Sequence, residues 1–268
     1  MNRIDQKFAE LKERGATALI PFLTVGDPDL ATSVDIILEL EQAGADMIEL
    51  GVPYSDPLAD GPVIQRASMR ALEHKITIRD CIGAASRARQ AGSQLPFILF
   101  TYYNPALQLG LETFFTLLSD NGISGVIIPD LPYEEDETVR KMSEERGIHL
   151  IPLVAPTSNE RISKIAARAA GFVYCVSSLG VTGVRSQFDA GIGEFLATVR
   201  SATELPIAVG FGISTGEQVR QFAKLCDGVI VGSAIVRQIE ETLPLLSAEA
   251  TRAEGLLQIR EFVRQLKH

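Results

Sequence analysis

The sequence predicts an α/β protein: a (β/α)₈ barrel (TIM barrel) with an extra N-terminal helix and an additional C-terminal helix. Short β-branched runs alternate strictly with segments of helical periodicity, the runs are apolar on both faces, and we count eight of them. Runs that are apolar on both faces are typical of a parallel sheet covered by helices, and eight strand-helix units close into a barrel. An open doubly wound sheet is the alternative, which a count of eight disfavours.

The expected strands follow one another at regular intervals. They are Ala18–Leu23, Met47–Gly51, Phe97–Thr101, Gly125–Pro129, His149–Val154, Phe172–Val176, Ile207–Gly210 and Gly228–Val231. Helices expected between them include Ser33–Gln42, Leu111–Ser119, Glu134–Glu145, Ser158–Ala169 and Gly216–Leu225. Several of these helical segments close on a glycine, which is the residue that most often ends a helix.

Two further helices lie outside the repeating pattern. Asn2–Arg14 carries Ile4, Phe8 and Leu11 on one side, and we expect it to close the bottom of the barrel. The other, Ser247–Leu266, follows Pro244 and would complete the outer ring of helices.

Size and composition favour one domain over residues 1–268, because barrels commonly run to about 250 residues as one unit. The net charge of −9 argues against a nucleic-acid surface. The N-terminus lacks an apolar signal core, and no apolar stretch approaches the roughly 18 residues of a membrane span. We therefore expect a cytoplasmic protein without membrane contact.

Cysteine and histidine are few and scattered through the chain. The three cysteines form no Cys-x-x-Cys pair, and the three histidines are equally far apart. Neither a disulfide framework nor a metal site is expected, and a Ser-His-Asp triad is disfavoured. No lysine ends a predicted strand, so a Schiff-base mechanism is disfavoured as well.

Two carboxylates stand where the second strand runs out into a loop rich in proline and glycine. Glu49 lies between Ile48 and Leu50 near the strand end, and Asp60 follows in the loop. The active sites of (β/α)₈ barrels lie at the C-terminal ends of the strands, so both carboxylates would face the same mouth. We interpret them as a positioned acid/base pair.

Each carboxylate also has a purely structural interpretation. Strand alternation would point Glu49 inward together with Met47 and Gly51, but a strand-end charge that reaches solvent is the alternative. Asp60 precedes Gly61-Pro62 and could serve as a helix N-cap.

Three glycine motifs follow the last three strands, and each precedes a helix. They are Gly180-Val-Thr182-Gly183, Gly210-Phe-Gly212-Ile-Ser214 and Gly232-Ser233. Glycine lets backbone N–H groups approach an oxygen-rich ligand, and a helix N-terminus adds a favourable dipole. We therefore expect a phosphate held by backbone amides, with ordinary tight turns as the alternative for any single motif.

The loop Pro53-Tyr-Ser-Asp56-Pro-Leu-Ala-Asp60-Gly-Pro62-Val-Ile-Gln65 is highly specific, and other motifs extend along the whole chain. They include Pro21-Phe22-Leu-Thr-Val-Gly26-Asp-Pro28, Tyr103-Asn104-Pro105, Pro129-Asp130-Leu-Pro132 and Gly210-Phe211-Gly212-Ile213-Ser214. Together these motifs resemble the tryptophan synthase alpha chain family. The resemblance implies a retro-aldol lyase that splits indole-3-glycerol phosphate into indole and glyceraldehyde 3-phosphate.

The resemblance also implies a role for each matching residue. Glu49 would protonate indole C3 and accept the glyceryl hydroxyl proton, while Asp60 would bind the indole N–H and stabilise the positive charge on the ring. The substrate-binding wall would comprise Phe22, Phe100, Ile127, Leu153, Tyr174 and Phe211, with core packing as the alternative for each. The phosphate cradle would comprise Gly183, Gly212, Gly232 and Ser233. Thr182 would order on loop closure and bond the aspartate.

One departure from the family pattern precedes that loop. Relatives carry arginine two residues before the Gly-Val-Thr-Gly motif, whereas this chain has Ser178-Leu179 before Gly180. The contacts that the arginine makes in closing the loop are therefore in doubt here, while the core chemistry is not.

The family partner is a beta chain that holds pyridoxal phosphate and receives indole, in an α₂β₂ complex, so no cofactor is expected in this chain. The surface expected to meet it includes Asp56, Asn104, Pro105 and Pro132, with solvated loops as the alternative. Besides a partner-activated lyase, two hypotheses stay open: a stand-alone lyase that releases free indole, and a catalytically weak allosteric binding subunit. The presence of both Glu49 and Asp60 speaks against the last.

Overall fold

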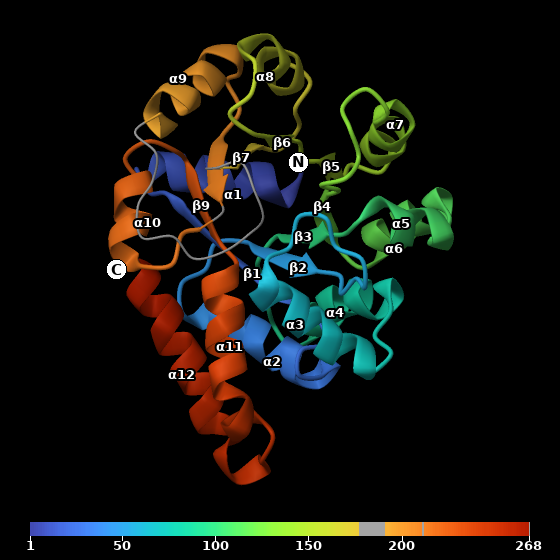
Figure 1. Cartoon of the computed structure of the whole chain (residues 1–268), viewed down its shortest axis with the longest axis vertical. Helices are drawn as coiled ribbons and strands as arrows, with labels where there is room; N and C mark the ends of the chain where they lie inside the picture. Colours follow the sequence, from blue (N-terminus) through green and yellow to red (C-terminus); the bar gives the residue numbers. More distant parts are fainter. Residues whose placement is uncertain (177–190, 211, 268) are drawn as a thin grey trace.

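The computed structural model describes residues 1–176, 191–210 and 212–267, and its parallel strands form a closed barrel surrounded by helices (Figure 1). In the described residues the strand order is β5-β4-β3-β2-β1-β9-β8-β7-β6. The strands are β1 Ala18–Thr24, β2 Ile48–Gly51, β3 Phe97–Phe100, β4 Ile123–Ile127, β5 His149–Leu150, β6 Leu153–Val154, β7 Val173–Val176, β8 Ile207–Gly210 and β9 Gly228–Val231. Because β5 and β6 are consecutive parts of one strand, the two ends of this order meet. The barrel prediction is confirmed.

The fifth predicted strand is one run in the sequence but two short pieces in the structure. β5 pairs with β4, and β6 pairs with β7. Between them, the Ile151 N–H still donates to the Val126 carbonyl at 2.9 Å, and the Pro152 carbonyl accepts from Tyr174 N–H at 3.0 Å. Pro152 has no N–H to donate, so the ladder is interrupted at this residue.

Most of the helices cover the outside of the barrel between successive strands, while α1 precedes the first strand and α11 and α12 follow the last. They are α1 Arg3–Glu13, α2 Leu30–Gln42, α3 Pro62–Glu73, α4 Ile78–Gln90, α5 Tyr103–Leu109, α6 Leu111–Asp120, α7 Glu137–Glu145, α8 Asn159–Ala166, α9 Ile192–Ala202, α10 Gly216–Phe222, α11 Ser233–Leu246 and α12 Glu249–Lys267. The helices predicted between strands are present, with ends that shift by a few residues.

Side-chain alternation along the strands divides the core into two layers. Residues such as Met47 and Ile98 belong to a cluster inside the barrel. Their strand neighbours Ile48 and Leu99 belong to the larger cluster between the sheet and the helices. Both faces of each strand are therefore buried, which is why the strands read as continuous apolar runs in the sequence.

The N-terminal helix closes one end of the barrel, as predicted. Ile4, Phe8 and Leu11 of α1 are buried in the cluster inside the barrel. The Phe8 ring packs against Phe172, with 5.5 Å between ring centroids. Gly125 leaves room for this packing, since a Cβ there would lie 2.8 Å from Cδ1 of Ile4. The end opposite α1, at the C-terminal ends of the strands, is thus the open mouth.

The C-terminal helix α12 packs beside α11 and also contacts α2 (Figure 1). Ile259, Val263 and Leu266 are its buried apolar residues. The sequence predicts a start at Ser247 after Pro244, but Pro244 lies inside α11 and α12 begins at Glu249. Among the described residues, no helix is both long and apolar enough to cross a membrane.

We predict that Ile4→Ala destabilises the barrel because it leaves a cavity in the cluster inside the barrel, to which Ile4 belongs. The free energy of unfolding should fall by about 3 kcal/mol, measured by urea denaturation. Gln6→Ala, an exposed position on the same helix, is the matched control and should change it by less than about 0.5 kcal/mol. Equal effects of the two substitutions would contradict the closing role of α1.

Candidate active site

Glu49 lies inside the barrel, near the C-terminal end of β2. Its neighbours Ile48 and Leu50 point outward into the sheet-helix core, so alternation turns Glu49 inward, as predicted. The residue is 1% exposed, and within the described residues its Oε1 has no hydrogen-bond partner. Desolvation raises the pKa of Glu49 to about 8, so the carboxyl is mainly neutral at neutral pH. The solvent-facing alternative is wrong.

Asp60 lies at the end of the loop after β2 and is also buried. Burial raises the pKa of Asp60 to about 6, and a hydrogen bond from the Tyr102 hydroxyl opposes that rise. The N-cap alternative is wrong, because Pro62 is the first residue of α3 and Gly61 occupies the cap position. Asp60 is thus free of a capping role and remains mostly ionised at neutral pH, unlike Glu49.

Tyr102 connects the catalytic loop to the end of β3, and sequence reasoning missed it. Its hydroxyl accepts a hydrogen bond from Ala59 N–H at 2.9 Å in addition to its bond with Asp60. Its ring stacks on Tyr54, with 4.9 Å between centroids. Burial raises the pKa of Tyr102, which keeps the hydroxyl protonated as a donor. The available signal was a tyrosine placed directly after the third predicted strand, at the mouth.

A cavity in the mouth brings together eight of the residues that the sequence singled out. It is lined by Phe22, Glu49, Asp60, Ile64, Phe100, Tyr174, Gly212, Ile230, Gly232 and Ser233. Ile64 and Ile230 were not predicted: Ile64 stands within the loop motif, but its apolar side chain suggests no role, and Ile230 is one of several apolar residues of β9. Acidic groups, aromatic rings and glycines therefore converge on one enclosed space.

Two glycines make room for the aromatic wall of this cavity. A Cβ on Gly51 would collide with the Phe22 ring, and a Cβ on Gly210 would collide with the Tyr174 ring. Phe22 in turn meets Phe100 edge to face, with 5.7 Å between centroids. The result is an apolar wall beside the carboxyl groups, suited to a flat aromatic ligand.

The glycine-containing part of the cavity has the features of an anion site. Gly232 and Ser233 form the start of α11, and no side chain caps that helix in the described part of the chain. The first N–H groups of a helix carry partial positive charge and favour an oxyanion. Gly212 adds a backbone position with φ of +86°, a conformation that favours glycine.

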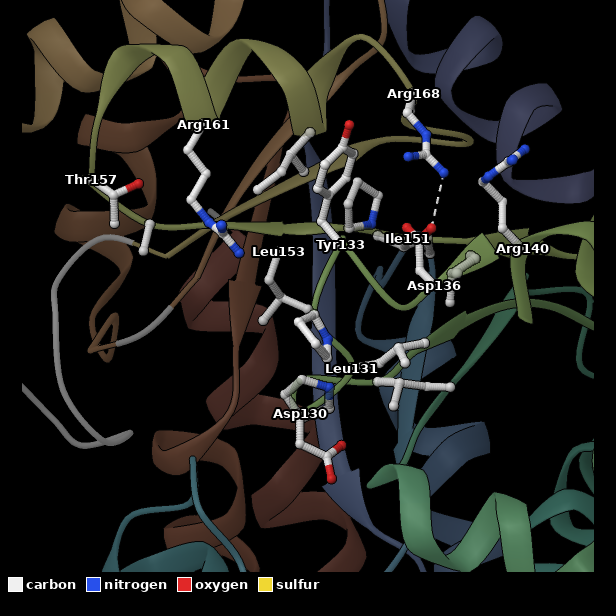
Figure 2. Close-up of a pocket in the computed structure, with 17 residues that line it drawn as sticks. Asp130, Leu131, Tyr133, Asp136, Arg140, Ile151, Leu153, Thr157, Arg161 and Arg168 are labelled. Atoms are coloured by element: carbon white, nitrogen blue, oxygen red, sulfur yellow. Dashed lines mark hydrogen bonds and ion pairs between the residues drawn. The ribbon is translucent and has the colours of Figure 1, made fainter. Parts of the chain in front are cut away.

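The remaining predicted substrate residues are placed differently. Ile127 is fully buried in the inner cluster. Leu153 lines a second cavity, of about 400 Å³, between α7, α8 and the loop after β4 (Figure 2). Thr182, Gly183 and Phe211, together with Ser178, lie outside the described residues.

Each of the three arginines that line this second cavity pairs with a carboxylate, although the buried Nε of Arg140, which pairs with Glu144 at 2.6 Å through Nη1, has no hydrogen-bond partner among the described residues. Arg161 binds Glu134, and Arg168 binds Asp136 at 3.0 Å while lying 4.7 Å over the Tyr133 ring. Figure 2 shows Arg161, Arg168 and Asp136 around apolar side chains that include Leu131 and Leu153. The charges of the arginines are therefore balanced within the chain.

The four residues expected at a partner interface all lie on loops or helix starts at the mouth. Asp56, Asn104 and Pro132 are exposed, and Pro105 is half-buried. Two exposed leucines accompany them: Leu58, 77% exposed, in the loop of Asp56, and Leu107, 47% exposed, on α5. Both leucines expose apolar side chains on the same segments that carry the expected interface residues.

Comparisons with known proteins agree with this geometry. A family model described as tryptophan synthase alpha chain matches residues 8–267. A tryptophan synthase alpha chain of Bacillus pumilus is 53% identical over 252 residues, which is 94% of this chain and 94% of that protein. One from a Geobacillus species is 52% identical over 247 residues, or 92% of this chain and 94% of that protein.

Solved structures give the same result. The tryptophan synthase alpha chain of Legionella pneumophila superposes with a TM-score of 0.87 at 35% identity, covering 100% of this chain and 96% of that one. A tryptophan synthase chain from Mycobacterium tuberculosis superposes with a TM-score of 0.87 at 35% identity, covering 99% and 97%.

The raised pKa of Glu49 predicts a pH-dependent stability. The native state keeps the proton up to a pKa of about 8, whereas the unfolded chain releases it near 4.5. Stability is therefore lost as the pH rises between these values, by about 5 kcal/mol in all. Glu49→Gln cannot ionise, so it should exceed the parent protein by that amount near pH 9 and match it near pH 4. Urea denaturation across this range checks the prediction, and parallel curves for both proteins would contradict it.

Proposed function

Because this chain belongs to the tryptophan synthase alpha chain family, we propose that Glu49 and Asp60 carry that family's reaction here. The protein is a lyase of tryptophan biosynthesis that cleaves indole-3-glycerol phosphate. The single observation that supports these roles is the pair of buried carboxyls whose pKa values lie about 8 and about 6. One carboxyl is mainly protonated at neutral pH, while the other is mainly ionised.

Glu49 moves the protons in this proposal. Its neutral carboxyl donates a proton to indole C3, which makes the ring cationic and the adjacent C–C bond labile. The resulting Glu49 carboxylate accepts the proton of the glyceryl hydroxyl as that carbon becomes the aldehyde. The electron pair of the broken C–C bond returns to the ring and restores neutral indole. One proton is given and one is taken back, so Glu49 ends the cycle as it began.

Asp60 stabilises the charge that appears between these steps. Its carboxylate accepts a hydrogen bond from the indole N–H, which becomes more acidic when C3 is protonated. The Tyr102 hydroxyl and the Ala59 backbone fix the position of Asp60 before substrate arrives. A preoriented anion in a dry site stabilises the cationic ring without reorganisation.

The rest of the cavity orients the two ends of the substrate. Phe22, Phe100 and Tyr174 would hold the indole ring, and Gly212, Gly232 and Ser233 would hold the phosphate. Ile127 and Leu153 stay in this proposal as members of the apolar wall around the indole: Ile127 lies in the cluster inside the barrel, and Leu153 packs against that cluster. Thr182, Gly183 and Phe211 complete it on their sequence match alone.

We further infer that the mouth binds a beta chain, which supplies the pyridoxal phosphate of the complete synthase, in an α₂β₂ complex. This alpha chain itself uses no cofactor. The exposed Leu58 and Leu107 beside Asp56 and Asn104 support the inference, since the alternative is an apolar rim left in water. The cytoplasmic location expected from the sequence stays a prediction.

The proposal predicts that Glu49→Gln lowers turnover of indole-3-glycerol phosphate by about 1,000-fold or more, with phosphate-ligand binding mostly kept. Asp60→Asn should also cost about 100-fold or more. Glu241→Gln, an exposed position on α11, is the matched control and should leave turnover unchanged. The assay is indole release, and near-normal release by Glu49→Gln would overturn the acid/base role.

The same assay with and without a purified beta chain tests the partner. Activation by the beta chain supports the complex. A high rate that the beta chain leaves unchanged would instead favour a stand-alone lyase, and a negligible rate in both conditions would favour a binding subunit.

A further inference from the structure

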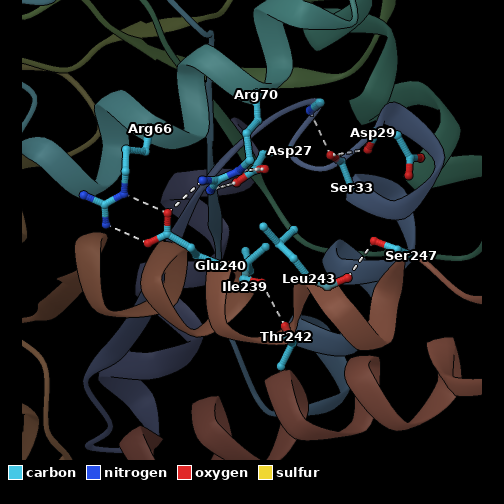
Figure 3. Close-up of polar contacts among 11 residues, drawn as sticks. Asp27, Asp29, Ser33, Arg66, Arg70, Ile239, Glu240, Thr242, Leu243 and Ser247 are labelled. Atoms are coloured by element: carbon cyan, nitrogen blue, oxygen red, sulfur yellow. Dashed lines mark hydrogen bonds and ion pairs between the residues drawn. The ribbon is translucent and has the colours of Figure 1, made fainter.

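Two arginines of α3 bind two carboxylates from other parts of the barrel (Figure 3). Arg70 donates from Nε and Nη2 to the two oxygens of Asp27 at 2.7 and 2.8 Å, and from Nη1 to Glu240 at 2.7 Å. Arg66 donates from Nε and Nη2 to the two oxygens of Glu240 at 2.8 and 2.7 Å. We call Asp27, Arg66, Arg70 and Glu240 the α3 clamp.

Arg70 is the central member of the α3 clamp. Within the clamp, only Arg70 bonds both Asp27 and Glu240. Its planar guanidinium directs donors to both carboxylates in one plane, and the ammonium group of a lysine cannot reproduce this geometry. Asp27 is only 2% exposed, so its charge depends on Arg70 for compensation. Arg66 is 50% exposed and binds Glu240 near solvent. The two arginines therefore share a partner but differ in what they hold.

The α3 clamp connects three segments that all lead into the active site. α3 begins two residues after Asp60. α11, which carries Glu240, begins at Ser233 in the anion end of the cavity. Asp27 lies three residues beyond β1, the strand that places Phe22 in the aromatic wall.

Arg70 and Glu240 lie at similar distances from the starts of their helices, so the bond between them holds α3 and α11 side by side. At about 1.5 Å per residue, Arg70 lies about 12 Å from the start of α3, and Glu240 lies about 10 Å from the start of α11. The bond between them joins the helices at similar depths below the mouth. The more exposed Arg66–Glu240 pair joins the same two helices, but Arg70 also ties them to Asp27 in the loop after β1. Arg70 therefore contributes to how far apart the two helix starts lie, and with them Asp60 and Ser233.

We propose that Arg70 is a positioning residue that fixes the separation between the Asp60 end and the phosphate end of the active site. The proposal rests on the site roles given under Proposed function. A substrate that spans both ends requires their separation to be right, whereas a ligand that occupies one end does not. A misplacement of about 1 Å far from the chemistry can cost about 100-fold in rate.

The test compares Arg70→Lys with Arg66→Lys, a matched control on the same helix with the same partner. Four quantities are measured for each variant: kcat/KM for indole-3-glycerol phosphate, the inhibition constant of indole, the inhibition constant of glycerol 3-phosphate, and Tm. We expect Arg70→Lys to lower kcat/KM by about 10- to 100-fold while each inhibition constant stays within about threefold. Arg66→Lys should leave kcat/KM and both inhibition constants within about threefold of the parent values and should leave Tm unchanged.

Two outcomes would overturn the proposal: a kcat/KM for Arg70→Lys equal to that of Arg66→Lys, or a loss of affinity for the two half-ligands in proportion to the loss of kcat/KM. If Arg70→Lys does not fold, Glu240→Gln removes the α11 charge that both arginines bind and keeps the Arg70–Asp27 pair. It should lower kcat/KM by the same factor while both half-ligand constants stay within about threefold. The proposed function is tested separately, by whether the parent protein releases indole and Glu49→Gln does not. A failure of the positioning role of Arg70 can therefore be told apart from a failure of the proposed function.

Discussion

The structure depends on the burial of one carboxyl group that has no compensating cation among the described residues. Glu49 sits among apolar and aromatic side chains, and its raised pKa comes from desolvation alone. The same enclosure that makes Glu49 a proton donor at neutral pH costs the fold stability whenever that group ionises. Asp60, nine residues beyond the end of β2, escapes full neutralisation because Tyr102 donates a hydrogen bond to it. Two groups of the same chemistry thereby acquire different protonation states.

Such a site needs a rigid frame, and the barrel supplies it in two ways. Parallel strands end at one mouth, which brings β1, β2, β3, β7 and β9 to the cavity. Behind the mouth, the α3 clamp binds the helix that follows Asp60 to the helix that starts at the anion site. Phe22 and Tyr174 occupy space that Gly51 and Gly210 leave open. The catalytic geometry is thus set by backbone spacing as well as by the acids themselves.

The sequence predicts the parts of this arrangement that are local. Eight doubly apolar runs predict the barrel, and a carboxylate inside one of them predicts Glu49 as a site residue. Pairings over long sequence distances were not predictable: Tyr102 holds Asp60 across 42 positions, and Arg70 binds Glu240 across 170. The break in the fifth strand follows from Pro152, whose missing N–H the apolar pattern conceals. The alternative in which Asp60 caps α3 is wrong because Pro62 is the first residue of that helix and Gly61 occupies the cap position.

The central claim is that burial keeps Glu49 protonated at neutral pH. Infrared difference spectra between the parent protein and Glu49→Gln, recorded as the pH is raised, isolate the carbonyl band of this one carboxyl. The band of the neutral acid should persist until the pH approaches the Glu49 pKa of about 8. Loss of the band near the ordinary pKa of 4.5 would contradict the claim.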